Sequence, residues 1–151
     1  MATITLSGKD SVIVNGRILA DLANADVGTL TFGTDLSTTT RGYNGNVIHS
    51  PNQSGKVGGL EIRVVRASAD DKFLQSIVNS YEQDSVAFRV VSAAITKRFS
   101  DGAGQITSDI YDCEFGVPAK AVETKVNTEG DVEQVISVYS FNFGNVKRVL
   151  S

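Results

Sequence analysis

Few residues in this sequence have side chains that could carry out acid–base or nucleophilic chemistry. His49 is the only histidine and lies in a stretch rich in Gly, Ser and Asn, so we expect no catalytic triad. Cys113 is the only cysteine, and strand-like alternation places its side chain on the same face as Tyr111 and Phe115. A buried, small hydrophobic residue is the favoured role for Cys113, and the sequence predicts no enzymatic activity.

Motifs for phosphate or metal binding lack residues that they require. Gly55-Lys56 resembles the end of a phosphate-binding loop, but Ser50 stands where that loop needs its first glycine, and no helix follows. One histidine and one cysteine are too few for a typical transition-metal site. Several acids early in the chain lack the spacing of a calcium loop; they are Asp10, Asp21, Asp26 and Asp35. We therefore expect no cofactor and no bound metal.

The composition is that of one folded domain spanning residues 1–151, with 41% hydrophobic and 21% charged residues. The 14 basic and 17 acidic residues give a net charge of −3, which argues against a surface that binds nucleic acid phosphates everywhere. The N-terminus has no pattern of a secretory signal, and every apolar stretch is shorter than the ~20 residues of a membrane helix. We expect a soluble protein made in a reducing bacterial cytoplasm, with no membrane contact.

Alternating and apolar segments separated by glycine-rich turns predict a mainly β fold. Asn15-Gly16 between two apolar runs predicts a tight hairpin, because both residues tolerate positive φ. We expect strands at 3–7, 12–14, 17–19, 27–32, 59–66, 86–99, 105–117, 119–126 and 131–143, with a short tail at 146–150. The expected architecture is a β-sandwich or barrel with one flanking helix.

One amphipathic helix is predicted at about residues 69–81. Ser68 has the character of an N-cap, and Asp70 and Asp71 complement the positive end of the helix dipole. Apolar residues recur with helical spacing on one face, which we expect to pack against the sheet. The packing residues are Phe73, Leu74 and Ile77.

Two features indicate that the protein assembles with other copies of itself. Residues 34–57 lose all periodicity, and a loop of that length in a small domain is usually functional or disordered. The last long strand is apolar on both faces: a core stripe of Tyr139, Phe141 and Phe143 shares one of them. A strand of this kind needs cover on both sides, which neighbouring subunits can supply.

The sequence resembles the tail tube proteins of contractile-tailed bacteriophages, a group first catalogued as phage structural proteins of unknown function. The resemblance covers nearly the whole chain and keeps the order of elements. It rests on ITLSGKDSVIVNGRILADLAN (4–24), LEIRVVRASADDKFL (60–74), GQITSDIY (104–111), KAVETKVNTEGDVEQVISVYSFNF (120–143) and the closing VKRVLS.

The resemblance implies a β-sandwich or half-barrel with a flanking helix. It also implies a subunit of the virion tail that forms stacked hexameric rings. The sheets of one ring join around a channel that holds DNA and the tape-measure protein, the sheath protein lies outside, and baseplate and tail terminator proteins close the tube. A long loop reaches the neighbouring ring, and residues 34–57 fit it. The candidate stacking residues are Thr38, Arg41, Tyr43, Asn44, His49 and Asn52.

An acidic channel would let DNA slide without sticking, because like charges repel the phosphates. Alternation places Asp112 and Glu114 opposite the apolar face of their strand, and Glu61 and Glu133 hold similar positions on two others. We expect some of these four acids to line the channel, with the outer ring surface as the alternative for each. A one-residue slip in strand register would exchange the two faces.

Three other functions compete with a DNA-conducting phage tube. The nearest is the inner tube of a contractile bacteriocin or of a type VI secretion system, which would pass protein through the same fold. A small-ligand-binding β-barrel is a different class, and the absence of tryptophan counts against its aromatic-lined pocket. An enzyme is the least favoured class.

Overall fold

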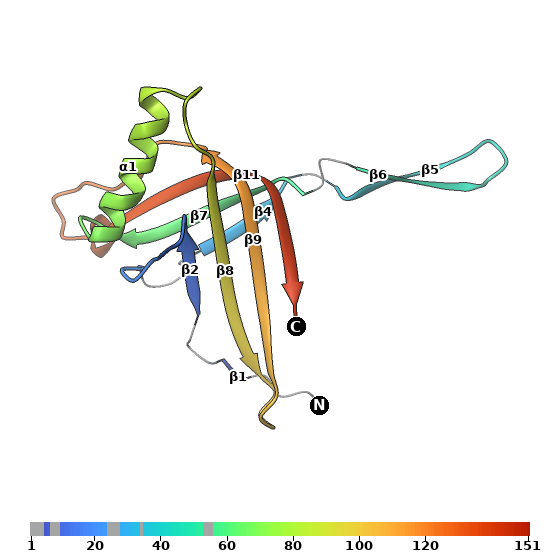
Figure 1. Ribbon diagram of the computed structural model, residues 1–151, viewed down its shortest axis with the longest axis horizontal. Coiled ribbons are helices and arrows are strands. Elements are labelled where there is room, and N and C mark those ends of the chain that lie inside the picture. Colours follow the sequence, from blue (N-terminus) through green and yellow to red (C-terminus); the bar gives the residue numbers. More distant parts are fainter. Residues whose placement is uncertain (1–4, 7–9, 24–27, 34, 53–55) are drawn as a thin grey trace.

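Figure 1 shows the computed structural model, which describes residues 5–6, 10–23, 28–33, 35–52 and 56–151. Parts of the predicted strands 3–7 and 27–32 and of the predicted loop 34–57 lie outside the described residues. The strands are β1 (Thr5–Leu6), β2 (Ser11–Val14), β3 (Arg17–Ile18), β4 (Gly28–Phe32), β5 (Ser37–Arg41), β6 (Val47–Pro51), β7 (Gly58–Val65), β8 (Val91–Ser100), β9 (Ile106–Pro118), β10 (Glu123–Thr124) and β11 (Ile136–Leu150). The helices are α1 (Ala69–Gln83) and the short 3-10 helix η1 (Val132–Val135).

Within the described residues, nine strands form one antiparallel sheet in the order β3-β2-β8-β9-β11-β7-β4, with β1 beside β8 and β10 beside β11. Asn15, with φ 50°, and Gly16, with φ 81°, form the predicted tight turn between β2 and β3. The prediction of a mainly β half-barrel with one flanking helix is confirmed. A closed barrel is not found in the described part of the chain, because β3 and β4 end the sheet on opposite sides without pairing with each other.

β9 and β11 change direction together at a bend in the middle of the sheet (Figure 1). Phe115 has φ 58° there, and the pairing of β8 with β9 shifts register between Val91 and Ala93, which marks a β-bulge. Gly116 has no space for a side chain, because a Cβ atom would lie 2.4 Å from Cε1 of Phe143. This close approach lets the sheet fold over the core while Phe143 stays buried.

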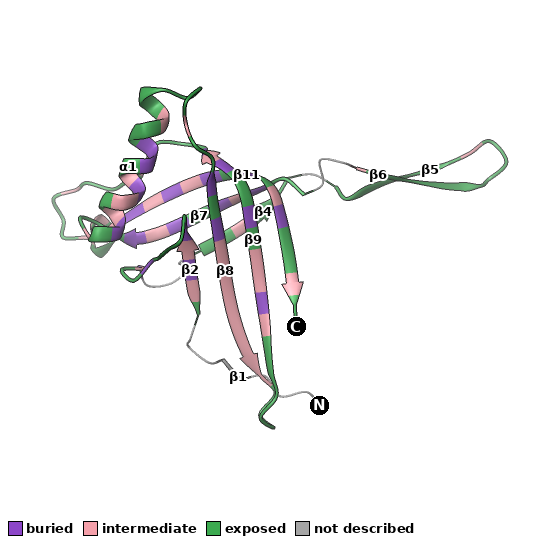
Figure 2. Ribbon diagram, in the orientation of Figure 1, coloured by how far each residue is buried: buried purple, intermediate pink, exposed green. Residues whose placement is uncertain are grey.

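The concave face of the bent sheet carries the core, and α1 covers part of it (Figure 2). The predicted aromatic stripe on β11 is buried here. Burial and a hydrogen bond to the Asp71 carboxylate raise the pKa of Tyr139 above its usual range, since the hydroxyl donates to that carboxylate. The largest buried apolar side chains are Tyr139, Phe141, Phe143, Leu60, Ile62, Leu74, Val14, Val64 and Val91.

α1 begins at the predicted residue and ends two residues beyond the predicted helix. Ser68 is the N-cap, and its hydroxyl oxygen accepts a hydrogen bond from the backbone N–H of Asp71 at 3.2 Å. Leu74 and Ile77 are buried against the sheet. Phe73 is only partly buried and lies at the edge of this contact, so its removal should cost less than the loss of a fully buried ring.

Asp70 joins α1 to the segment that follows β3. Its side chain is 1% exposed, and its Oδ2 accepts hydrogen bonds from the backbone N–H groups of Ala20 and Asp21, both at 2.7 Å. The Nε of Arg17 donates to Oδ1 at 3.1 Å. The sequence explained Asp70 only as a charge at the helix start, whereas the structure makes it the link between two distant segments.

Most predicted strands differ from the structure by one or two residues at an end, and three differ by more. β8 begins five residues late, because the Asp84 carboxylate accepts hydrogen bonds from the N–H groups of Val86 and Ala87 and holds a turn there. Only two residues of the predicted strand 119–126 pair, as β10. The start of the strand predicted at 131–143 is η1, and the remainder continues through the predicted tail as β11.

Replacement of Asp70 by Ala should lower the free energy of unfolding by roughly 3 kcal/mol, because it leaves two backbone donors and one guanidinium without their buried acceptor. Chemical denaturation measures the change. Glu82→Ala on the exposed side of the same helix is the control and should shift stability by no more than about 0.5 kcal/mol. Equal stabilities for the two variants would show that the Asp70 contacts do not hold α1 in place.

Candidate assembly surfaces

A two-stranded hairpin projects from one end of the body (Figure 1). β5 and β6 pair from Ser37 with Pro51 to Arg41 with Val47. The turn is closed by the N–H of Gly42, which donates to the carbonyl of Asn46 at 2.6 Å. Every residue of both strands is exposed. We call residues 36–52 the arm.

The loop predicted at 34–57 contains a β-hairpin in the part of it that the structure describes. The signal that predicts the arm was present in the sequence: Asn44-Gly45 separates two short segments as Asn15-Gly16 does, and Gly45 has φ 80°. The sequence did not reveal the arm, because every residue of its two strands is exposed and neither face is buried. Without a buried face they need no alternation of apolar and polar residues, which is the usual sign of a strand.

The predicted stacking residues all lie on the arm. The arm also exposes apolar side chains: Tyr43 at the tip is fully exposed, and Val47 and Ile48 are each 52% exposed. His49 contacts a hydroxyl on the facing strand, with Nδ1 3.0 Å from Oγ1 of Thr39. Thr38 and Arg41 lie on β5, Tyr43 and Asn44 in the turn, His49 on β6 and Asn52 after it.

Three of the four candidate channel acids share one face of the sheet. We call the face turned away from the core the outer face. Glu61 alternates with the buried Leu60 and Ile62 on β7, and Asp112 and Glu114 flank the buried Cys113 on β9. All three acids are exposed on the outer face. Because the outer face spans both sides of the bend, these acids come from different parts of one continuous surface.

The outer face is less acidic than the sequence suggested. Lys147 on β11 lies directly opposite Asp112, and Asn145 lies opposite Glu114. Cross-strand neighbours of opposite charge offset each other locally. The alternation predicted from residue 110 to residue 115 also stops early, since the bulge turns Phe115 outward and leaves it 62% exposed.

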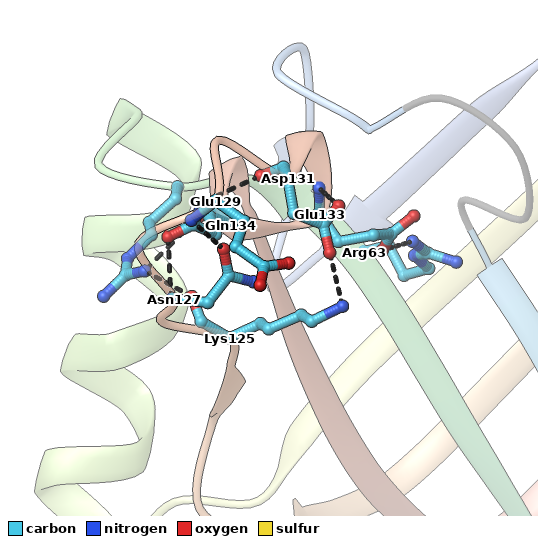
Figure 3. A network of polar contacts seen from close by, with 8 residues as sticks. Arg63, Lys125, Asn127, Glu129, Asp131, Glu133 and Gln134 are labelled. Carbon is cyan, nitrogen blue, oxygen red and sulfur yellow. Dashed lines mark hydrogen bonds and ion pairs between the residues drawn. The ribbon is translucent and has the colours of Figure 1, made fainter.

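The fourth acid, Glu133, lies on η1 and not on a strand, which corrects its predicted alternating position. Its Oε2 accepts a hydrogen bond from Nη2 of Arg63 at 3.0 Å, as part of a polar network that joins η1 to the sheet (Figure 3). Asp131 caps η1 and accepts a hydrogen bond from Lys125. That bond raises the pKa of Lys125 and lowers the pKa of Asp131.

The described residues offer little catalytic chemistry. Cys113 is buried, and burial together with the nearby charge of Asp112 raises the pKa of its thiol to about 11. Among the residues with assigned positions, no group of three His, Cys, Asp or Glu side chains could hold a metal ion. No helix in the described part of the chain is long and apolar enough to span a membrane.

A comparison of the sequence with protein-family models identifies the class of protein. The family model of the bacteriophage PhiTE tail tube protein matches residues 1–151. The chain therefore belongs to this tail tube family, whose members are structural components of phage tails. Membership of a structural family supports a non-enzymatic role. No curated protein sequence matches the chain.

Solved structures with the same fold come from contractile injection systems. A chain of the sheath/tube terminator of the extracellular contractile injection system PVC has a TM-score of 0.67 and 13% identity, over 95% of this chain and 94% of that one. A chain of the PVC sheath-tube complex has a TM-score of 0.66 and 11% identity, over 96% and 90%. The tube-terminating cap of the anti-feeding prophage has a TM-score of 0.65 and 9% identity, over 96% and 90%. At these identities the likeness establishes the fold.

The Cys113 thiol of the folded protein should react slowly with a thiol reagent at about pH 8, because a pKa near 11 leaves only about one thiol in a thousand ionised. The rate should rise with pH as the thiolate fraction grows. Absorbance of a coloured disulfide reagent follows the reaction, with denaturant-unfolded protein as the control that labels quickly. Complete labelling of the folded protein within minutes at neutral pH would contradict the burial.

Proposed function

We propose that copies of this chain form hexameric rings that stack into a tail tube, and that the channel of the tube conducts DNA during ejection. The tube is part of the virion tail and its subunits are made in the host cytoplasm. Its partners are the sheath protein outside, the tape-measure protein inside, and the baseplate and tail terminator proteins at its ends. Membership of the tail tube family supports these assignments.

The observation that carries the proposal is the open sheet. β4 at one edge and β3 with β2 at the other leave backbone N–H and C=O groups available to pair with strands of neighbouring copies. A head-to-tail contact between two different edges of the same subunit closes into a ring when the rotation between copies fits. Joined sheets would then line one continuous wall.

The arm supports stacking of the rings. Its strands contribute nothing to the core of their own subunit, and its apolar tip is exposed to solvent. Exposed apolar groups gathered on a projection are typical of a surface that another protein covers. In the proposed tube, the arm of one subunit contacts the next ring.

The outer face of the sheet is the proposed channel wall. Glu61, Asp112 and Glu114 then contribute negative charge along the path of the DNA, while Lys147 offsets part of it. Glu133 contributes less, because Arg63 already neutralises its carboxylate. A wall of mixed charge with a modest acidic excess neither binds the DNA phosphates tightly nor repels them strongly, so DNA can pass.

A second candidate function is the inner tube of a contractile injection system that passes protein. The observation that favours it is the likeness to chains from the PVC and anti-feeding prophage particles. The gene neighbourhood separates the two functions: capsid and terminase genes beside this one indicate a DNA-carrying phage, and their absence indicates a protein-conducting particle.

Deletion of residues 38–54 should leave a folded subunit that no longer forms tubes, because every residue of the two strands of the arm is exposed and outside the core. Circular dichroism and thermal unfolding check the fold, and electron microscopy with sedimentation checks assembly. The unaltered protein at the same concentration is the control. Normal tubes formed by the deletion variant would remove the arm from the stacking contact.

The double change Asp112→Lys with Glu114→Lys should leave tubes intact and make them retain DNA at low salt, because two negative positions per subunit become positive. Co-sedimentation of tubes with labelled DNA across a salt series measures retention, which should fall as salt rises. The matched control is Glu82→Lys with Asp21→Lys, at two exposed positions outside β9 and outside the segment 119–136. Equal retention by the two double variants would show that Asp112 and Glu114 do not line the channel.

A further inference from the structure

The arm and α1 lie at opposite ends of the long axis of the molecule (Figure 1). The connection between β10 and β11 is at the α1 end, since Nη1 of Arg66, just before the helix, donates to the carbonyls of Lys125 and Gln134 at 3.2 Å and 3.1 Å. When identical subunits stack head to tail, the projecting end of one meets the opposite end of the next. With the long axis of the subunit along the tube, the arm of a following copy would arrive at the α1 end.

That end carries a hollow of about 490 Å³ between β10 and η1. Half-buried apolar side chains form part of its lining: Val122, Ile136 and Val138. Charged groups line it as well, with Glu123 and Glu133 against Lys125. A hollow of this size with an apolar floor can take an aromatic side chain, with the Glu123 carboxylate available to a cation beside it.

The connection between β10 and β11, beside the hollow, is fixed by hydrogen bonds of its polar side chains, while some of its apolar side chains are exposed. Hydrogen bonds fix it from within (Figure 3): Gln134 Oε1 accepts from the N–H of Asn127 at 2.9 Å. Meanwhile Val126 is 78% exposed and Val132 is 75% exposed. The hydrogen bonds hold this segment in one conformation while its valines are exposed to solvent. A partner that covers it therefore pays little conformational entropy for ordering the segment.

The arm offers the complementary chemistry. Tyr43 stands fully exposed at its tip, and Arg41 ends β5 close by. Arg41 is the only charged residue of residues 36–52 apart from the titratable His49. The segment 119–136 carries four acids against two lysines. Within the described residues, Glu123 is exposed and has no ion pair, so its carboxylate is available to a cation from outside.

We propose that the hollow between β10 and η1 receives the arm tip of the next copy, with Tyr43 against the apolar floor and Arg41 beside Glu123. This proposal rests on the stacking role of the arm and adds the surface that the arm contacts. It assigns the β10–η1 segment, which contributes little to the core, to the axial contact between rings.

Exchange of the charges tests the pairing. Arg41→Glu and Glu123→Arg, each alone, should raise the protein concentration needed for tube formation by roughly tenfold or more, and the two together should restore it to within a few fold of the unaltered protein. Tyr43→Ala should raise it by a similar factor. Turbidity and electron microscopy over a concentration series provide the measurement, and unfolding curves check that each variant is folded.

The matched control combines Arg41→Glu with Glu82→Arg, an exposed acid on α1 outside the hollow, and should show no rescue. Val132→Asp at the exposed edge of η1 is a second change on the acceptor side if Glu123→Arg fails to fold. Assembly at the normal concentration by both acceptor variants, or rescue by Glu82→Arg, would overturn the proposal. If tubes also form after the arm is deleted, the stacking role itself fails; loss of tubes on deletion together with normal acceptor variants overturns the acceptor surface alone.

Discussion

β11 is the strand on which the rest of the structure depends, because it joins the two halves of the sheet. Its first half pairs with β7, from Ile136 to Phe143, and its second half pairs with β9 up to Leu150. The bend between the halves requires Gly116, whose missing side chain gives Phe143 its place in the core. A Cβ at this position would meet backbone as well as side chain, so the neighbours could not move away at low cost.

The bent sheet explains why this subunit suits assembly. Because the sheet folds over the core, one helix is enough to cover its inner face. Two strand edges and the outer face remain uncovered and could contact other molecules. The arm and the β10–η1 segment also contribute little to the core, and they lie at opposite ends of the body (Figure 1). Core, edges and ends thus have separate roles, and changes in one need not disturb the others.

Local signals predicted most of the fold, and tertiary constraints account for the remainder. The Asn15-Gly16 turn and the Ser68 cap depend on residues close in sequence, so their chemistry could be read directly. The outward turn of Phe115 depends on packing between Gly116 and Phe143, which are far apart in the chain. The position of Lys147 opposite Asp112 likewise depends on which strands pair and in which register, and the sequence pattern alone did not reveal either. The arm was missed because a strand without a buried face carries no alternation.

The most direct test of the account is electron microscopy of the purified protein over a range of concentrations. The account predicts stacked rings in which the sheets of adjacent subunits join edge to edge, the outer face lines the channel and each arm crosses to the next ring. Stable monomers at high concentration, or tubes in which α1 and not the outer face of the sheet lines the channel, would contradict it.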